Sequence, residues 1–288
     1  MNRISKSMKR ITVAFQGEHG AFSEQAANRY FSKSSRTLPL RTFQEVFGSV
    51  VRGKAQYGII PIENSLFGSI HQNYDLLQKF NLNIVGEVKL RVVHALLVNQ
   101  QTRIKDVKFI YSHPQALGQC EKFLDRLNGV EVVAVYDTAG AAKFIRDEHR
   151  MDAAAIASLE AAKVYGLRVI RSGIESDHQN FTRFLILSRK KAIATSNAKT
   201  SIIFSMKDIP GALYKALSVF ALREINLHKI ESRPLVGKPW EYLFYVDFQG
   251  SIFDGACRNA LNHLKEITTY LKILGSYPEG KTVTRQPR

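Results

Sequence analysis

The order in which short β-rich runs and helical runs follow one another constrains the fold of this chain more than any other feature. From residue 11 to about 189, runs rich in β-branched and aromatic residues alternate with amphipathic runs, which is typical of an α/β domain with a largely parallel sheet. Strands are predicted at ITVAFQG, QYGIIPI, NIVGEV, HALLV, VKFIYS, VEVVAVY, AAAIA and FTRFLILS. Helices are predicted at SEQAANRYF, SIHQNYDLLQKF, ALGQCEKFLDRL, AGAAKFIRDEHR and SLEAAKVYG.

A second unit is predicted after this α/β region. Residues 190 to 199, KKAIATSNAK, are short, polar and unpatterned, which predicts a linker. From residue 200 to 279 the pattern is strand, helix, strand, strand, helix, strand. This βαββαβ order is typical of a ferredoxin-like plait, so we expect a large α/β domain followed by a small module.

Composition narrows the class of protein. The chain has 288 residues, with 45% hydrophobic and 23% charged, which is ordinary for a folded protein larger than one typical domain. No apolar run approaches the roughly 20 residues of a membrane span, and we expect a cytoplasmic protein without membrane partners. The two cysteines, Cys120 and Cys257, lie far apart, so neither a disulfide nor a metal site is expected.

The net charge of +16 raises the possibility of a nucleic-acid partner. The distribution of the charge argues against it, because lysines and arginines are scattered singly and no basic helix is interleaved with aromatic residues. A small acidic metabolite would explain a positive balance equally well. We therefore expect no nucleic-acid partner.

Junctions between strands and helices carry small polar residues that could bind an anion. In GEHGAFS, Gly17 and Gly20 permit a tight turn and Ser23 is predicted to cap a helix, but the spacing is not that of a dinucleotide or Walker loop. In PIENSLFGSIHQ, three polar residues follow a predicted core strand and need partners, of which a ligand is one. These residues are Glu63, Asn64 and Ser65.

A further junction, YSHPQALGQC, fits a capping box from Ser112 to Gln115, with Gln119 one helical turn beyond. In YDTAGAA, Thr138 is predicted to be a cap. No Ser/His/Asp triad, metal-ligand cluster or Schiff-base lysine is recognisable, so we expect no cofactor and a mechanism based on hydrogen bonds and positioning.

The stretch NFTRF places Thr182 and Arg183 at the beginning of a predicted buried strand. Strand propensity alone would account for the threonine, and solubility of a strand end would account for the arginine. From the residues alone, both the structural and the functional interpretation stay open.

Several segments resemble a known family. GEHGAFSEQAA, PIENSLFGSIHQNYDLL, SHPQALGQC, DTAGAA and NFTRFLIL resemble, in this order, the blocks of prephenate dehydratases, and PGALYKAL and ESRP resemble the phenylalanine-binding motifs of the ACT regulatory domain. The resemblance runs from about residue 11 to 278. Because about ten residues precede the first predicted strand, the chain resembles the monofunctional form, without a chorismate mutase domain.

The resemblance implies a catalytic domain over residues 11–189 that folds as two lobes, like a type II periplasmic binding protein. One lobe would span about 11–88 and 178–189, the other about 92–176, and the ACT domain would span 200–279. The family pattern implies Thr182, Asn64, Ser112 and Gln119 as catalytic positions. Glu63, Ser65 and Arg183 are inferred to bind substrate as neighbours in the matching segments.

The implied reaction is the loss of carbon dioxide and hydroxide from prephenate to give phenylpyruvate. Aromatisation supplies the driving force, so the protein need only orient the dianion and assist the departing hydroxide, which Thr182 would either protonate or hydrogen-bond. Arg183 would face the pyruvyl carboxylate or have a structural part. An arogenate dehydratase and, less favoured, a non-catalytic amino-acid-responsive binding protein are the alternatives.

For the C-terminal module, the resemblance implies feedback regulation by L-phenylalanine bound between paired ACT domains, and therefore a homodimer or homotetramer. The implied phenylalanine-binding positions are Gly211, Ala212, Leu213, Asn226, Glu231, Ser232, Arg233 and Pro234.

Overall fold

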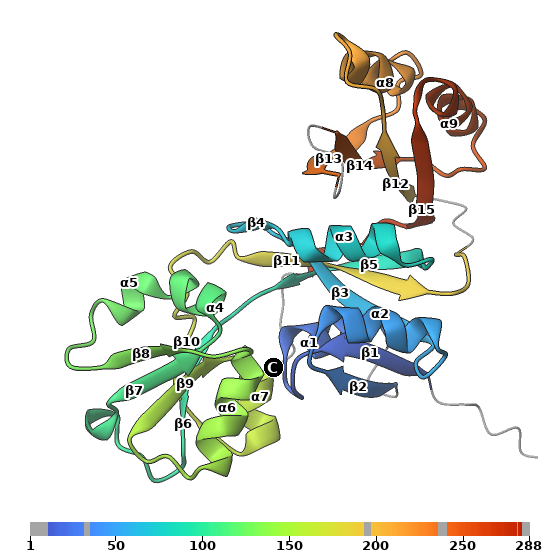
Figure 1. Ribbon diagram of the computed structural model, residues 1–288. Helices are drawn as coiled ribbons and strands as arrows, with labels where there is room; N and C mark the ends of the chain where they lie inside the picture. The colour runs from blue at the N-terminus through green and yellow to red at the C-terminus, as the bar shows by residue number, and fades with distance from the viewer. Residues whose placement is uncertain (1–10, 32–34, 193–196, 236–240, 281, 284–288) are drawn as a thin grey trace, which may run out of the picture. The chain divides into compact units, whose positions relative to one another are not determined.

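The computed structural model describes residues 11–31, 35–192, 197–235, 241–280 and 282–283 (Figure 1). Contacts divide the chain into two compact units. The first contains the described residues up to Ile70, residues Val88–Phe184 and 282–283, and the second contains His71–Glu87 and the described residues from Leu185 to 280. The predicted domain limits stay a prediction, and residues 193–196 of the predicted linker lie outside the described residues.

The first α/β lobe is built on a sheet with the strand order β16-β5-β11-β3-β1-β2. Its strands are β1 (Thr12–Gln16), β2 (Arg36–Leu40), β3 (Tyr57–Asn64), β5 (Asn83–Arg91), β11 (Phe181–Ser188) and β16 (Thr282–Val283), with β4 (Gly68–Ser69) paired to β3. The helices of this part are α1 (Phe22–Phe31) and α2 (Phe43–Val51). Helix α2 begins with a capping box between Thr42 and Glu45.

The second lobe has a five-stranded sheet with the order β10-β6-β9-β7-β8. Its core strand β9 (Ala153–Ala157) is fully buried, and its alanines let the alanine-rich face of α6 (Thr138–Asp147) approach closely. The other elements are β6 (Ala95–Val98), η1 (Ile104–Asp106), β7 (Phe109–Ser112), α4 (Pro114–Gln119), α5 (Glu121–Leu124), β8 (Glu131–Ala134), α7 (Leu159–Tyr165) and β10 (Arg168–Ser172).

The chain crosses between the two sheets twice, and the two crossings lie side by side. On the outward crossing, the backbone N–H of Val92 donates to the carbonyl oxygen of Asn180 on the return crossing, at 2.8 Å. Further along, Gly173 N donates to His94 O at 2.9 Å. Strand β11 then returns to the first sheet between β3 and β5, so the predicted two-lobed α/β fold class is confirmed.

The C-terminal module is an antiparallel sheet with the strand order β13-β14-β12-β15 (Figure 1). Helices α8 and α9 cover one face of it, around a core that includes Phe204, Phe220 and Phe248. Its elements are β12 (Ala198–Ser205), α8 (Ala212–Ala221), β13 (Leu227–Pro234), β14 (Tyr242–Gln249), α9 (Gly255–Ile267) and β15 (Tyr270–Pro278). The predicted βαββαβ order is therefore confirmed, and residues 236–240 of its central turn lie outside the described residues.

The opposite face of this sheet contacts helix α3 (His71–Lys79). The hydroxyl of Tyr245 donates to the carbonyl oxygen of Tyr74 at 2.8 Å, and their rings meet edge to face. At the end of α3, the Lys272 ammonium donates to the carbonyl oxygens of Leu77, Gln78 and Phe80 at 2.9, 3.1 and 2.8 Å. A cation at these unpaired carbonyls stabilises the helix C-terminus.

Local predictions of helix starts were wrong at three junctions. Helix α1 begins at Phe22, so Ser23 lies inside it, and α6 is capped by Asp137 rather than by Thr138. Helix α4 is capped by His113, whose Nδ1 accepts from Gln115 N at 3.2 Å. The hydroxyl of Ser112 instead donates to Ile156 O on strand β9, at 2.6 Å.

Other differences concern element type. The helix predicted over ALGQCEKFLDRL is interrupted at Cys120, between α4 and α5. Strands β2 and β10 and helix α2 were not predicted; β2 contains Pro39, which weakens a strand signal but is tolerated at a sheet edge. Among the helices in the described ranges, none has the length and apolar character needed to cross a membrane.

Candidate active site

The end of β3 and the beginning of β11 bring Asn64 and Thr182 together. The side-chain amide of Asn64 donates to Thr182 Oγ1 at 3.0 Å and to Asn180 Oδ1 at 2.7 Å. Its own Oδ1 accepts from the backbone N–H groups of Leu66 and Phe67, at 3.0 and 3.1 Å, which locks the amide orientation. All three polar side chains are at least nine-tenths buried.

Two hydrogen-bonding groups of this cluster have capacity left. Thr182 Oγ1 accepts a hydrogen bond from Asn64, and within the described part of the chain no acceptor is recorded for the hydroxyl proton of Thr182 itself. Asn180, which is fully buried, likewise has no recorded partner for its amide nitrogen among the described residues. Buried polar groups in folded proteins are normally hydrogen-bonded, so a missing partner indicates a ligand or a water.

Ser65 supports this cluster through the backbone. Its hydroxyl donates to Gln179 O at 2.7 Å and accepts from Phe181 N at 2.9 Å, and its own N–H donates to Phe181 O at 2.8 Å. These bonds join the end of β3 to the residues that lead into β11. The geometry therefore favours a positioning role for Ser65 over direct contact with a substrate.

Glu63 and Arg183 form a pair on the other face of the same two strands. Successive side chains of a strand point to opposite faces, so Arg183 points away from the face that carries Thr182, and Glu63 away from Asn64. Arg183 is 6% exposed, and its Nη1 lies 3.2 Å from Glu63 Oε1. The guanidinium of Arg183 is buried, pairs with Glu63 and lies on the face opposite to that of Thr182. These features favour the structural alternative for Arg183.

A substitution tests this assignment of Arg183. We expect Arg183→Met to lower the melting temperature, because the carboxylate of Glu63 loses a charged partner in a partly buried position. The Michaelis constant of the folded variant should stay within about threefold of the wild-type value, because a factor of ten would correspond to about 1.4 kcal/mol of lost substrate binding. Steady-state kinetics and thermal unfolding of the same preparation measure both; a large rise in the Michaelis constant would assign Arg183 to the substrate.

A second polar cluster lies where the crossings meet the second lobe. Gln119, the last residue of α4, is 6% exposed, and its Oε1 lies 2.6 Å from Nε2 of His94. His94 follows β5 on the outward crossing and is 2% exposed. Burial lowers the pKa of His94 and keeps its imidazole neutral. The hydroxyl of Ser112 donates to Ile156 O and is not recorded in a hydrogen bond with either residue of this pair among the described residues.

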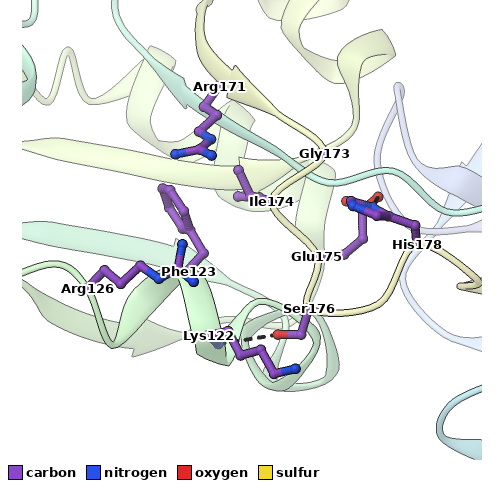
Figure 2. A pocket seen from close by; sticks show the side chains of 9 residues that line it. All are labelled: Lys122, Phe123, Arg126, Arg171, Gly173, Ile174, Glu175, Ser176 and His178. Carbon is purple, nitrogen blue, oxygen red and sulfur yellow. Dashed lines mark hydrogen bonds and ion pairs between the residues drawn. The ribbon is translucent and has the colours of Figure 1, made fainter.

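The return crossing holds both members of this second cluster. The backbone N–H of His94 donates to Glu175 Oε2 at 3.0 Å, and Ser176 N donates to Gln119 O at 2.7 Å. Glu175 and Ser176 line a pocket of about 140 Å³. Figure 2 shows their side chains in its wall. The pocket is also lined by Lys122, Phe123, Arg126, Arg171, Gly173, Ile174 and His178.

The GEHGAFS loop, first of the predicted anion junctions, contacts the second lobe. Glu18 N donates to Asp137 Oδ2 at 3.1 Å, and Ser158 Oγ donates to Gly20 O at 2.7 Å. Gly20 has φ +88° and lies against the backbone of Ala161, where a Cβ atom would come within 2.6 Å of the Ala161 Cα. The backbone groups of this loop at Glu18 and Gly20 contact the second lobe. Contact between the lobes is therefore an alternative to anion binding as the role of the loop.

Sequence reasoning missed His94 and Asn180. Asn180 stands in the NFTRF segment, but strand propensity drew attention to Thr182 and Arg183 only. His94 stands alone between two predicted strands, and nothing in its neighbours indicates that it meets Gln119 from another lobe. Its partner is 25 residues away in the chain, so no local pattern could have identified it.

In the C-terminal module, the implied phenylalanine positions fall at two places. Gly211, with φ +75°, is the N-cap of α8, and Ala212 and Leu213 lie in the first turn of that helix. No side chain caps this N-terminus, although Ala212 N donates to Ile209 O at 3.1 Å. Glu231 and Arg233 on β13 instead contact helix α3: Glu231 Oε1 lies 3.2 Å from His71 Nε2, and Arg233 Nη2 lies 3.2 Å from Asp75 Oδ2. The remaining positions, Asn226, Ser232 and Pro234, are exposed.

Two α/β lobes are joined by a double crossing that carries amide and hydroxyl groups at both ends, and a ferredoxin-like module follows in the chain. This arrangement defines a two-lobed enzyme with a regulatory module. A model of the prephenate dehydratase family matches residues 13–192, and a model of the ACT domain matches residues 200–251. The chain belongs to the prephenate dehydratase family of hydro-lyases and carries an ACT domain.

Relatives and solved structures agree with this assignment. The chain is 49% identical to arogenate dehydratase/prephenate dehydratase 2 of Arabidopsis thaliana, over 98% of this chain and 77% of that protein. It is 40% identical to the bifunctional chorismate mutase/prephenate dehydratase of Aquifex aeolicus, over 94% and 74%.

Among solved structures, prephenate dehydratase of Arthrobacter aurescens in complex with L-Phe superimposes with a TM-score of 0.86 and 29% identity, over 93% of this chain and 90% of that one. A chain described as GqqA, a novel type of quorum quenching acylase, superimposes with a TM-score of 0.85 and 35% identity, over 93% and 98%.

Proposed function

We propose that this chain converts prephenate into phenylpyruvate, with loss of carbon dioxide and hydroxide. The observation that carries the proposal is the hydroxyl of Thr182, which accepts a hydrogen bond from Asn64 and keeps its own proton available. A donor that is itself a hydrogen-bond acceptor is polarised, so its proton becomes a better donor to a leaving oxygen. Family membership supplies the reaction class.

The chemistry requires little covalent participation from the protein. The bond between the ring and its carboxylate breaks, its electron pair enters the ring, and the hydroxide departs with the pair of the breaking C–O bond. Thr182 donates its hydrogen bond to that oxygen as negative charge develops there. Threonine is a weak acid, so we assign it stabilisation of the leaving group rather than complete proton transfer.

The free amide groups suit the remaining polar atoms of the substrate. Asn180 and Gln119 present uncharged donors, which can orient a carboxylate without the strong attraction of a salt bridge. This matters because an enzyme that over-stabilises the carboxylate to be lost would raise the barrier to decarboxylation. Arg183 is already paired with Glu63, in keeping with a substrate site that relies on neutral donors.

Arogenate is the second candidate substrate, because relatives named as arogenate dehydratases are 42–49% identical to this chain. Arogenate carries an amino group in place of the keto oxygen and would give phenylalanine directly. Amide hydrolysis, suggested by the acylase name of one similar structure, is less favoured. It would need a base at the nucleophile, and in the described ranges no histidine or carboxylate is recorded in a hydrogen bond with Thr182.

Turnover of the purified chain tests the proposal. Prephenate and arogenate are supplied separately, phenylpyruvate and phenylalanine are quantified, and each assay is repeated with added phenylalanine. We expect phenylpyruvate from prephenate and a lower rate with phenylalanine present. A larger kcat/KM for arogenate than for prephenate would make arogenate the proposed substrate. Activity on neither compound would remove the dehydratase proposal.

Feedback regulation is proposed at the ACT domain. The open N-terminus of α8 can receive the carboxylate of phenylalanine, since free N–H groups and the helix dipole favour an anion there. Tyr214 on α8 and Leu222, the residue that follows the helix, are 77% and 78% exposed, and exposed apolar side chains favour pairing with a second copy. We therefore propose that phenylalanine binds to paired ACT domains in a homodimer or homotetramer.

We propose that helix α3 couples phenylalanine binding at the ESRP residues of β13 to the candidate active site. It pairs with Glu231 and Arg233, and only six residues separate its first residue, His71, from Asn64 in the chain.

We expect Asp75→Asn to weaken inhibition by phenylalanine at least threefold, because Asp75 on α3 forms the ion pair with Arg233. Calorimetry should show an unchanged affinity for phenylalanine. Asp106→Asn, at an exposed pair with Arg103, is the matched control. Normal inhibition in Asp75→Asn would remove α3 from the route.

A further inference from the structure

His94 is a buried histidine that joins three parts of the catalytic domain. It lies on the outward crossing, its ring meets the edge of Phe22 from the first lobe at 5.4 Å between centroids, and its Nε2 contacts Gln119 from the second lobe. Its backbone N–H is held by Glu175 on the return crossing. The side chain of Glu175 is 1% exposed. Both ends of the histidine are thus fixed by buried groups.

The hydrogen bonds determine which ring nitrogen carries the proton. Burial keeps the imidazole neutral, so only one nitrogen is protonated. Nδ1 is buried and has no partner recorded among the described residues. A buried N–H without an acceptor is costlier than a buried acceptor without a donor, so the proton belongs on Nε2, where Gln119 Oε1 accepts it at 2.6 Å.

This tautomer determines which end of the Gln119 amide remains available. When Oε1 accepts from His94, the NH₂ group on the same carbon is directed away from the histidine and can only donate. We propose that His94 is a positioning residue that holds Gln119 with its NH₂ group toward the substrate, an inference that rests on the proposed dehydratase function. With the other tautomer the amide would reverse and present an acceptor, which would repel a substrate carboxylate.

The surroundings hold the pair rigid. Ser176 N donates to the backbone carbonyl oxygen of Gln119 at 2.7 Å, and the Glu175 carboxylate accepts from the backbone N–H of His94. Two neighbouring residues of the return crossing therefore fix the backbones of Gln119 and His94. Figure 2 shows Glu175 and Ser176 on one continuous stretch of that crossing. With the backbone positions of both partners fixed, the direction of the amide is set by its hydrogen bond to His94, the one bond recorded for this side chain among the described residues.

Kinetics of paired variants test the positioning role. His94→Leu keeps an apolar side chain of moderate size but removes the donor, and we expect kcat/KM to fall by about 100-fold, the scale of misplacing a binding group. His94→Gln, whose terminal amide can restore a donor near Nε2, should recover at least tenfold relative to the leucine variant. In a Gln119→Ala background, His94→Leu should have little further effect, because both variants remove the same oriented amide. Additive losses would overturn the proposal.

A second measurement does not depend on turnover. In protein labelled with ¹⁵N-histidine, long-range ¹H–¹⁵N spectra distinguish the two tautomers, and the signals of His94 among the 8 histidines are those missing from His94→Gln. We expect a proton on Nε2 at neutral pH, and a proton on Nδ1 would overturn the proposal even if the leucine variant failed to fold. An Nε2 proton in a chain that turns over neither prephenate nor arogenate would reject the proposed function and leave the His94–Gln119 geometry supported.

Discussion

Thr182→Val should lower kcat by at least about 100-fold while the protein remains folded, since removing a positioned hydrogen-bond donor or acid typically costs 10²–10⁴ in rate. Valine has nearly the shape of threonine and the same preference for strands, so packing in β11 is preserved. Only the hydroxyl that accepts from Asn64 is lost. Thr182→Ser keeps that hydroxyl and should retain much more activity than the valine variant.

The matched control is Thr200→Val in the C-terminal module. Thr200 is also a fully buried strand threonine, and its hydroxyl donates to Gly250 O at 2.7 Å. This variant should lose stability but keep the kcat of the folded protein. Rates are measured at saturating substrate, with circular dichroism spectra of each variant as the test of folding. If Thr182→Val kept near-normal kcat, the proposed role of its hydroxyl would be wrong.

Glu87→Gln should destabilise the chain by about 3 kcal/mol, the lower end of the cost of breaking a buried ion pair. Glu87 and Lys199 lie 2.8 Å apart, with side chains 0% and 3% exposed, so the substitution leaves an ammonium away from water. Glu279, 3.3 Å from Lys199, offsets part of the loss because it can still pair with the lysine. Urea unfolding measures the change in free energy.

Two further variants separate burial from charge. The double variant Glu87→Leu/Lys199→Met removes both charges and should recover most of the stability, because well-packed apolar residues replace buried ion pairs at little cost. Asp106→Asn disturbs a pair of comparable length, Arg103–Asp106 at 2.8 Å, whose side chains are 70% and 42% exposed, and should cost less than about 1 kcal/mol. Equal losses at the two pairs would contradict the importance assigned to burial.

The periodic parts of the fold could be read from the sequence. Strands such as AAAIA and FTRFLILS and the helices of the ACT module carry long, consistent patterns, and the structure confirms them. Helix starts were less predictable, since Ser112 and Asp137 compete with their neighbours for the same N–H groups. His113 caps α4, and the hydroxyl of Ser112 instead donates across the sheet to Ile156 O, a partner 44 positions away in the chain.

Site geometry was less accessible than site composition. The sequence indicated Asn64, Thr182 and Gln119, but their partners come from segments far apart: Asn64 and Thr182 are 118 positions apart in the chain. From the sequence, Arg183 could bind the substrate or form a structural pair. In the structure it lies on the strand face opposite to that of Thr182 and forms an ion pair with Glu63.

The sequence by itself determined the alternation of strands and helices, the family and the residue types available to the site, because periodicity and short motifs are local properties of the chain. Only the tertiary structure decided which hydroxyl Asn64 orients, which face Arg183 occupies, and that His94 holds Gln119. These outcomes depend on how the two crossings pack between the lobes, and such packing arises from contacts that no stretch of neighbouring residues encodes.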